Sequence, residues 1–206
     1  MNEVSSEIKH KKLTNAHVNF VRISDMNLGD KYTNFENTIL KNSNTLLYEI
    51  ENKPLYFRRY SRGSIVKVRF GVNIGSEFSG DHFAIVVSKG DTAYNPVLHV
   101  IPISSKKHKR CVDLGNVLIL DSEIEKLRLD YSKESDNTKK KKIKNSLKYY
   151  SKRDNITSYA LIEHMKTISK MSIIPPINEY DYIDKIRISN EKMKEIDNNI
   201  IKEYTL

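Results

Sequence analysis

The sequence predicts an α+β fold: a small β-barrel followed by a C-terminal helix, with a helical N-terminal extension and a basic helical insertion. Three observations predict it. Short apolar runs separated by Gly and Asx turns occupy the middle of the 206-residue chain. Apolar residues three or four apart mark the C-terminus, and Lys-rich sequence interrupts the apolar runs at about 121–154. We therefore expect an extension over residues 1–61 and the barrel domain over residues 62–206.

Composition predicts a cytoplasmic protein without a membrane partner. No apolar run approaches the roughly 20 residues needed to cross a bilayer, and residues 1–12 lack the apolar core of a signal peptide. Cys111 is the only cysteine, so an intrachain disulfide is excluded. The formal net charge of +9 favours a polyanionic partner. An AT-rich coding sequence, which enriches lysine, explains the same charge without such a partner.

The extension contains one helical pattern. Asn34 is placed to cap a helix, in which apolar residues recur near one face: Phe35, Ile39, Leu46, Leu47 and Ile50. After a turn at 62–64, the expected strands are 65–70, 83–88, 97–103, 112–114, 117–120, 158–162, 173–174 and 186–188. The run 83–88 is almost continuously apolar, which is typical of a strand buried on both faces. A Gly-rich loop, residues 71–80, precedes it.

The insertion and the C-terminus are expected to be helical. Within 121–154, an unbroken run of Lys139 to Lys142 accompanies apolar residues that predict two short helices around a solvated loop: Ile124, Leu127, Ile143, Leu147 and Tyr150. Ser189 or Asn190 starts the last helix. Its apolar stripe, which indicates core packing rather than a partner site, is Met193, Ile196, Ile200 and Tyr204.

Four blocks of sequence, in this order, resemble the MazF/PemK toxins. The first is Arg62-Gly63-Ser64-Ile65-Val66, and the second is Gly75-Ser76-Glu77 leading to Gly80-Asp81-His82-Phe83 at the head of the apolar strand. The third ends at Ser104-Ser105, and the fourth spans 159–168. The resemblance covers roughly 62–120 and 156–206. It implies an SH3-like barrel, a homodimer, a small antitoxin protein as partner, and metal-independent cleavage of single-stranded RNA without a cofactor.

Such cleavage uses the substrate's own 2′-hydroxyl as nucleophile and leaves a 2′,3′-cyclic phosphate and a 5′-hydroxyl. It needs a proton-transfer group and donors that stabilise charge on phosphorus. His82 is the first candidate, because imidazole titrates near neutral pH and serves as base, acid or both. The family often carries its catalytic arginine at this position. A histidine without a role at the end of a loop is the alternative interpretation.

Two further residues are catalytic candidates. By the resemblance, Ser104 takes the place of the family's catalytic threonine, so its hydroxyl is expected to donate to a phosphate oxygen. Glu77, in the Gly-rich loop, is expected to orient His82 or to act as base. Each has a simpler interpretation: a polar residue that ends a strand, and a solvated carboxylate in a turn.

RNA-binding candidates follow the serine pair. Ser105 is expected to assist, and the basic loop, residues 106–110, is expected to contact phosphates through Lys106, Lys107 and Lys109. Phe78 is a candidate for stacking on unpaired bases. A solvated hairpin loop is the alternative for the basic run.

No metal site is expected. The histidine pairs His10 and His17, or His99 and His108, lack zinc-type spacing, and the Gly-rich loop lacks the ending of a phosphate-binding loop. Two other functions remain open: a non-catalytic nucleic-acid-binding or regulatory module on the same barrel, and a regulatory or partner-docking role for residues 1–61.

Overall fold

The computed structural model describes the backbone of residues 2–26 and 28–205 and the side chains of residues 6–26, 28–29 and 31–205. The chain divides into two compact units. Unit 1 is Met1–Lys53 with Gly71–Gly80, and unit 2 is Pro54–Phe70 with Asp81–Leu206. Among the helices described, none is both long enough and apolar enough to cross a membrane.

Unit 1 is helical. It contains α1 (Asn2–Ser24), the 3-10 helix η1 (Asp30–Tyr32) and α2 (Phe35–Asn52). The sequence analysis did not predict α1, because no regular apolar stripe marks it. The two long helices meet where the Phe20 ring lies edge-on to the Phe35 ring, with 5.8 Å between centroids.

The predicted helix α2 is confirmed, but its expected cap and apolar face are only partly right. Asn34 holds the N-cap position with φ 59° and its side chain makes no capping hydrogen bond. Phe35 is buried, whereas Leu46, Leu47 and Ile50 are exposed. The Gly-rich loop belongs to this unit, and its ends are joined by the Gly80 N–H, which donates to the Gly71 carbonyl oxygen at 2.7 Å.

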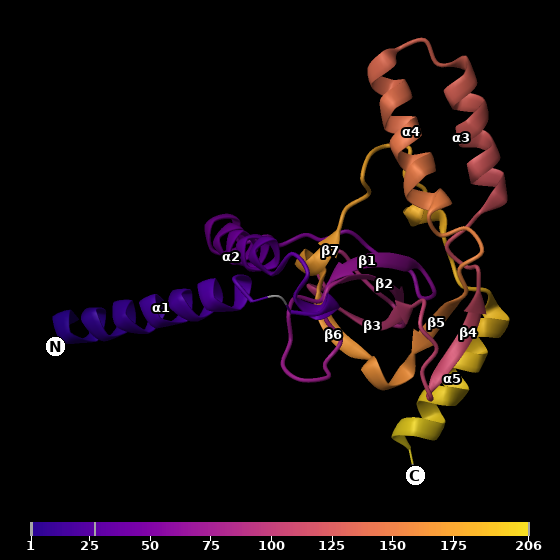
Figure 1. The fold of residues 1–206 in the computed structure, drawn as a ribbon. Helices are drawn as coiled ribbons and strands as arrows, with labels where there is room; N and C mark the ends of the chain where they lie inside the picture. The colour runs from indigo at the N-terminus through magenta and orange to yellow at the C-terminus, as the bar shows by residue number, and fades with distance from the viewer. Residues whose placement is uncertain (1, 27, 206) are drawn as a thin grey trace. The chain divides into compact units, whose positions relative to one another are not determined.

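Unit 2 is built on an antiparallel sheet (Figure 1). Its described strands are β1 (Ile65–Arg69), β2 (Asp81–Val86), β3 (Val97–Ser104), β4 (Cys111–Gly115), β5 (Ser158–Leu161), β6 (Lys166–Ser169) and β7 (Ile173–Ile174). The strand order is β4-β5-β3-β2-β1-β7, and β6 also pairs with β3. The expected burial of the apolar run is confirmed, because residues 83–87 are all buried.

The central strand β3 has different partners on its two edges. One edge pairs with β2, and the other pairs first with β6 and then, at Ile103 and Ser104, with β5. Hydrogen-bonded and non-bonded pairs alternate along an antiparallel ladder. Because the Val87 N–H donates to the His99 carbonyl oxygen, the backbone nitrogen of Pro102 faces away from β2. On that edge β6 pairs with residues 97–100 and β5 pairs with residues 103–104. Pro102, which has no N–H, therefore lies where neither strand needs its hydrogen bond.

The α+β class is confirmed, but the sheet does not close into the predicted barrel. The strand path ends at β4 and at β7, and no pairing joins these two strands in the part of the chain described. Two predicted strands are absent. Residues 117 and 118 lie in a turn closed by the Ile119 N–H and the Asn116 carbonyl oxygen, and residues 186–188 make a single bridge, Ser64 to Arg187. Without them no strand connects the two edges.

The insertion forms a helical pair, α3 (Asp121–Lys133) and α4 (Asn137–Ser151), which confirms the two predicted helices (Figure 1). The Lys run lies within α4 and not in the connecting loop. The pair is not wholly solvated, because Leu127, Ile143 and Tyr150 are buried in the core of the unit.

The C-terminal helix α5 (Asn190–Tyr204) starts as predicted, with the Ser189 hydroxyl accepting from the Lys192 N–H. Met193 and Ile196 of its apolar stripe are buried. The turn before β1 packs beneath this helix. Gly63 has φ 81°, and a Cβ there would lie 3.5 Å from the Met193 side chain. A Cβ at that distance would make an ordinary van der Waals contact, so it is the positive φ of the turn that favours glycine here.

Candidate functional site

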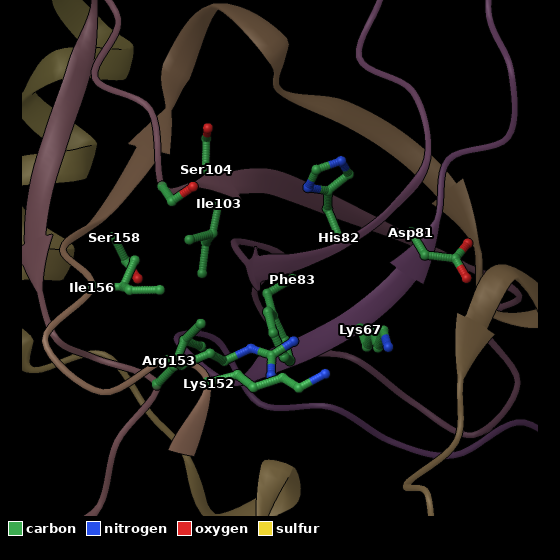
Figure 2. A pocket seen from close by; sticks show the side chains of 12 residues that line it. Lys67, Asp81, His82, Phe83, Ile103, Ser104, Lys152, Arg153, Ile156 and Ser158 are labelled. Carbon is green, nitrogen blue, oxygen red and sulfur yellow. The ribbon is translucent and has the colours of Figure 1, made fainter. Parts of the chain in front are cut away.

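A cleft of about 330 Å³ opens on unit 2 beside the ends of β2 and β3 (Figure 2). Strands β1, β2, β3 and β5 contribute to it, together with the segment after α4. Its lining residues are Lys67, Asp81, His82, Phe83, Ile103, Ser104, Ser105, Leu118, Lys152, Arg153, Ile156 and Ser158. Of the predicted site residues, His82, Ser104 and Ser105 line this cleft.

The sheet register explains why His82 and Ser104 meet. The pairs of β2 with β3 are Ala84 with Pro102, Ile85 with Ile101 and Val86 with Val100. Continued by two residues, this register sets His82 opposite Ser104. Cross-strand partners point to the same face of a sheet, and both side chains are partly exposed. Figure 2 shows the imidazole and the serine hydroxyl on the same side of the cleft.

Ser104 is oriented by the start of the basic loop. Its hydroxyl oxygen accepts a hydrogen bond from the Lys106 N–H at 3.0 Å. With that acceptor position used, the O–H is directed elsewhere and can donate to a substrate oxygen. A serine hydroxyl that accepts from the N–H two residues later forms a local turn, a common arrangement for serine outside regular secondary structure.

Three cationic side chains line the cleft, and only one carboxylate does. The cations are Lys67, Lys152 and Arg153, and the carboxylate is Asp81. Asp81 lies 3.9 Å from the Nε of Arg69, and in Figure 2 its carboxylate points away from His82. The cleft is therefore electropositive, which suits a phosphate ligand.

Aromatic rings support two of these cations. The guanidinium carbon of Arg153 lies 4.1 Å from the Tyr149 ring centroid and 5.1 Å from the Phe83 ring centroid. The Nζ of Lys67 lies 5.1 Å from the Tyr149 centroid. Such cation–π contacts hold the charged groups over the ring faces. Figure 2 shows Arg153 reaching over Phe83, across the cleft from His82 and Ser104.

The start of α4 is fixed by a cap. The Asp136 carboxylate accepts from the N–H groups of Thr138 and Lys139 at 2.7 and 3.1 Å. These backbone hydrogen bonds lower the pKa of Asp136, because they favour its charged form. The cap therefore sets where the helix begins, and with it the face that each later residue presents.

The end of α4 is fixed by Tyr150. Its ring stacks on Tyr182 with 3.7 Å between centroids, and its O–H donates to Asp181. Burial raises the pKa of Tyr150, and the hydrogen bond to Asp181 adds to this rise. The Arg153 N–H donates to the Tyr150 carbonyl oxygen at 2.8 Å. The contacts of Tyr150 with Tyr182 and Asp181 thus fix the end of α4, which positions Arg153 at the cleft.

Sequence reasoning missed Lys67, Lys152 and Arg153. Lys152 and Arg153 lie in the basic insertion, which is outside the part of the sequence that carries the resemblance. Arg153 precedes β5 by only a few residues, and the structure pairs Tyr159 of β5 with Ser104. Residues just before that strand therefore had to emerge beside Ser104.

Other predicted residues are not part of the cleft lining. Glu77 and Phe78 belong to unit 1, in the Gly-rich loop, where the Phe78 carbonyl oxygen accepts from the Asn73 amide at 2.7 Å. Lys106, Lys107 and Lys109 are exposed between β3 and β4. Lys109 lines a different pocket, of about 300 Å³, with residues of α5.

Comparison with known proteins identifies the family. The model of the PemK-like, MazF-like toxins of type II toxin–antitoxin systems matches residues 61–203, which include the helical insertion. No curated protein matches the chain. Because the family match covers more than half of the sequence, this chain belongs to the PemK-like, MazF-like toxins of type II toxin–antitoxin systems.

Proposed function

We propose that this toxin is an endoribonuclease that cleaves single-stranded RNA by attack of the 2′-hydroxyl, with residues 62–206 as its catalytic part. One observation carries the proposal: His82 and Ser104 face one cleft rimmed by Lys67, Lys152 and Arg153. Family membership also implies an antitoxin protein as partner. Action in the cytoplasm as a homodimer is part of the proposal.

In the proposed reaction, His82 removes the proton of the 2′-hydroxyl. The 2′-oxygen then forms a bond to phosphorus while the bond between phosphorus and the 5′-oxygen breaks. The leaving 5′-oxygen takes up a proton from the imidazolium formed at His82 or from water, so the products are a 2′,3′-cyclic phosphate and a 5′-hydroxyl. An imidazole suits either transfer, because its unperturbed pKa of about 6.5 leaves both protonation states populated near neutral pH.

Charge builds on the non-bridging oxygens as the 2′-oxygen attacks. The Ser104 O–H is proposed to donate to one of them, and Arg153 and Lys152 to stabilise the remaining charge from the other wall. Where the family often has arginine, this chain has His82, and the arginine at the cleft comes from the insertion. We propose that the two residues divide the work: His82 transfers the proton and Arg153 binds the phosphate.

The test measures cleavage of a single-stranded RNA in EDTA by the full chain and by His82→Ala and Ser104→Ala. Positioned acid–base groups contribute about 10²–10⁴-fold and a single oxyanion donor about 10²–10³-fold, so losses of that size are expected. The control variants are His99→Ala and Ser132→Ala, which lie outside the cleft lining. Circular dichroism checks that each variant folds.

The products distinguish the mechanism from its alternative. Mass spectrometry of the fragments should find cyclic-phosphate and 5′-hydroxyl ends. Full activity in His82→Ala would remove the mechanism. Salt-sensitive RNA binding without any cyclic-phosphate ends would support a non-catalytic binding module instead.

A further inference from the structure

A second group of chemically active side chains lies outside the cleft. His108, Glu163 and His164 each offer one potential ligand atom, and these atoms all lie within 4.8 Å of one another. The Glu163 Oε1 lies 3.8 Å from the Nδ1 of His108 and 3.8 Å from the Nε2 of His164. No other group of this kind was found in the described part of the chain.

The fold brings the three residues together from distant positions in the sequence. His108 lies in the basic loop, three residues before β4, while Glu163 and His164 form the end of the 3-10 helix η2 (Ile162–His164), directly after β5. Strands β4 and β5 pair, with Cys111 opposite Leu161. The cluster is therefore set at the end of the β4–β5 ladder by the register of that pair.

Hydrogen bonds hold the backbone on both sides of the cluster. The Cys111 thiol donates to the His108 carbonyl oxygen at 3.0 Å. On the other side, the Tyr204 hydroxyl donates to the Ile162 carbonyl oxygen at 3.2 Å, and the Met165 N–H donates to the same oxygen at 3.0 Å. Ile162 itself is buried. The ligand atoms are thus carried on supported segments and not on a free tail.

The donor set selects a class of ion. Two imidazoles and one carboxylate suit zinc and the neighbouring divalent transition metals, whereas magnesium and calcium prefer all-oxygen sites. Tetrahedral zinc with ligand bonds of about 2.0–2.1 Å places its ligand atoms about 3.3–3.4 Å apart. The two separations from Glu163 are 3.8 Å, and all three ligand atoms lie within 4.8 Å of one another, so side-chain rotations that bring them closer would close the site.

We propose that His108, Glu163 and His164 bind one zinc ion. The side chains are partly exposed, at 39, 36 and 22%, so a water molecule completes the coordination. None of the three lines the cleft with His82 and Ser104. Because His108 lies in the basic loop and Glu163 and His164 lie in η2, the bound ion would link these two segments. The inference does not depend on the proposed ribonuclease activity.

The first test measures zinc binding by the tag-free full chain in competition with a chromophoric chelator. The wild type should bind one equivalent. His108→Gln, Glu163→Gln and His164→Gln should each weaken binding by at least about tenfold, the smallest loss found even for outer partners of a metal site. Cobalt bound in place of zinc should give visible absorption bands that these variants lack.

Two matched variants control the assignment. His99→Gln removes an exposed histidine that contacts Thr167 instead of the cluster, and Cys111→Ser removes the nearby thiol. Both should bind zinc as the wild type does. Absence of saturable binding in the wild type would overturn the proposal, as would full binding by a His108→Gln/His164→Gln double variant. Loss of binding in Cys111→Ser would overturn the ligand assignment.

A second measurement tests whether the bound zinc links the basic loop to η2. The basic loop contains four trypsin sites: Lys106, Lys107, Lys109 and Arg110. Zinc should slow tryptic cleavage in this loop of the wild type and leave the rate unchanged in His164→Gln, which also controls for an effect of zinc on trypsin. Equal protection of both proteins would contradict the proposed link between loop and η2.

Discussion

The buried ion pair between Asp91 and Lys170 offers the sharpest test of the fold. The two side chains are 0 and 2% exposed, and their charged atoms lie 2.8 Å apart. The Lys170 ammonium also donates to the Thr92 carbonyl oxygen at 2.9 Å, and the Tyr60 N–H donates to Asp91 at 2.8 Å. The pair joins η3 (Lys170–Ser172) to the loop between β2 and β3. The perturbation is Asp91→Asn, which removes the charge and keeps the shape.

The expected loss is large because the variant leaves a buried ammonium without a counter-charge. Breaking one partner of such a pair costs about 3–5 kcal/mol, against a total unfolding free energy of about 5–15 kcal/mol for a folded domain. The amide oxygen of the introduced asparagine would still accept from the Tyr60 N–H, so that contact is kept while the charge and the acceptor that face Lys170 are lost. Adding Lys170→Met removes the unpaired charge and should recover part of the loss, leaving about 1–3 kcal/mol for each buried group without a partner, the Thr92 carbonyl and the introduced amide N–H.

Urea unfolding followed by circular dichroism measures these differences, with an unchanged denaturant slope as the check that each variant unfolds alike. Lys185→Met is a suitable control, because its ion pair with Glu123 is exposed and should contribute at most about 1 kcal/mol. A loss below about 1 kcal/mol in Asp91→Asn would refute the reasoning. So would a double variant that is less stable than the single one.

The difference in unfolding free energy between the wild type and Asp91→Asn should depend on pH in a defined direction. Burial alone raises the pKa of Asp91, but the hydrogen bonds from Lys170 and Tyr60 and the Lys170 charge outweigh it and hold the pKa below the usual 3.8. A carboxyl whose folded pKa is depressed contributes stability above its unfolded pKa and loses it as pH falls through the folded pKa. The gap between wild type and Asp91→Asn should therefore shrink below about pH 4. A constant gap would contradict this.

Two further predictions concern the insertion. In a cleavage-deficient His82→Ala background, Arg153→Gln should reduce the slope of log RNA affinity against log salt by about 0.7, the value for one phosphate contact on a single strand. Fluorescence anisotropy measures the affinity at each salt concentration. An unchanged slope would show that Arg153 does not contact the RNA backbone. Tyr150→Phe should keep the stack on Tyr182 but lose the hydrogen bond to Asp181, lowering unfolding free energy by about 1–3 kcal/mol. Unaltered stability in urea would show that this hydrogen bond contributes little.

Local sequence determined most of the elements. The almost continuously apolar run 83–88 is typical of a strand buried on both faces, and residues 83–86 in β2 have that burial. Ser189 before an apolar stripe specified the start of α5, because its hydroxyl satisfies an N–H of the first turn. The order of four blocks was enough to indicate the toxin family, which the match over 61–203 confirms.

Where the sequence prediction was wrong, the local pattern did not contain the deciding information. Residues 117–120 are as apolar as a strand, yet they form a turn in which Leu118 is buried. A run of four apolar residues shows no period that separates strand from buried turn. Residues 186–188 form only one β-bridge, between Arg187 and Ser64. A strand needs a free neighbouring strand edge as well as a suitable composition.

Sequence alone thus determined most of the strands and helices, and which residue types are available for proton transfer and phosphate binding. The tertiary structure decided which of them meet. The register of β2 on β3 sets His82 across from Ser104, the pairing of β5 with β3 carries Arg153 to the same cleft, and the β4–β5 pair brings His108 to His164. The physical reason is that register follows from the burial of whole sheet faces, which no single segment encodes.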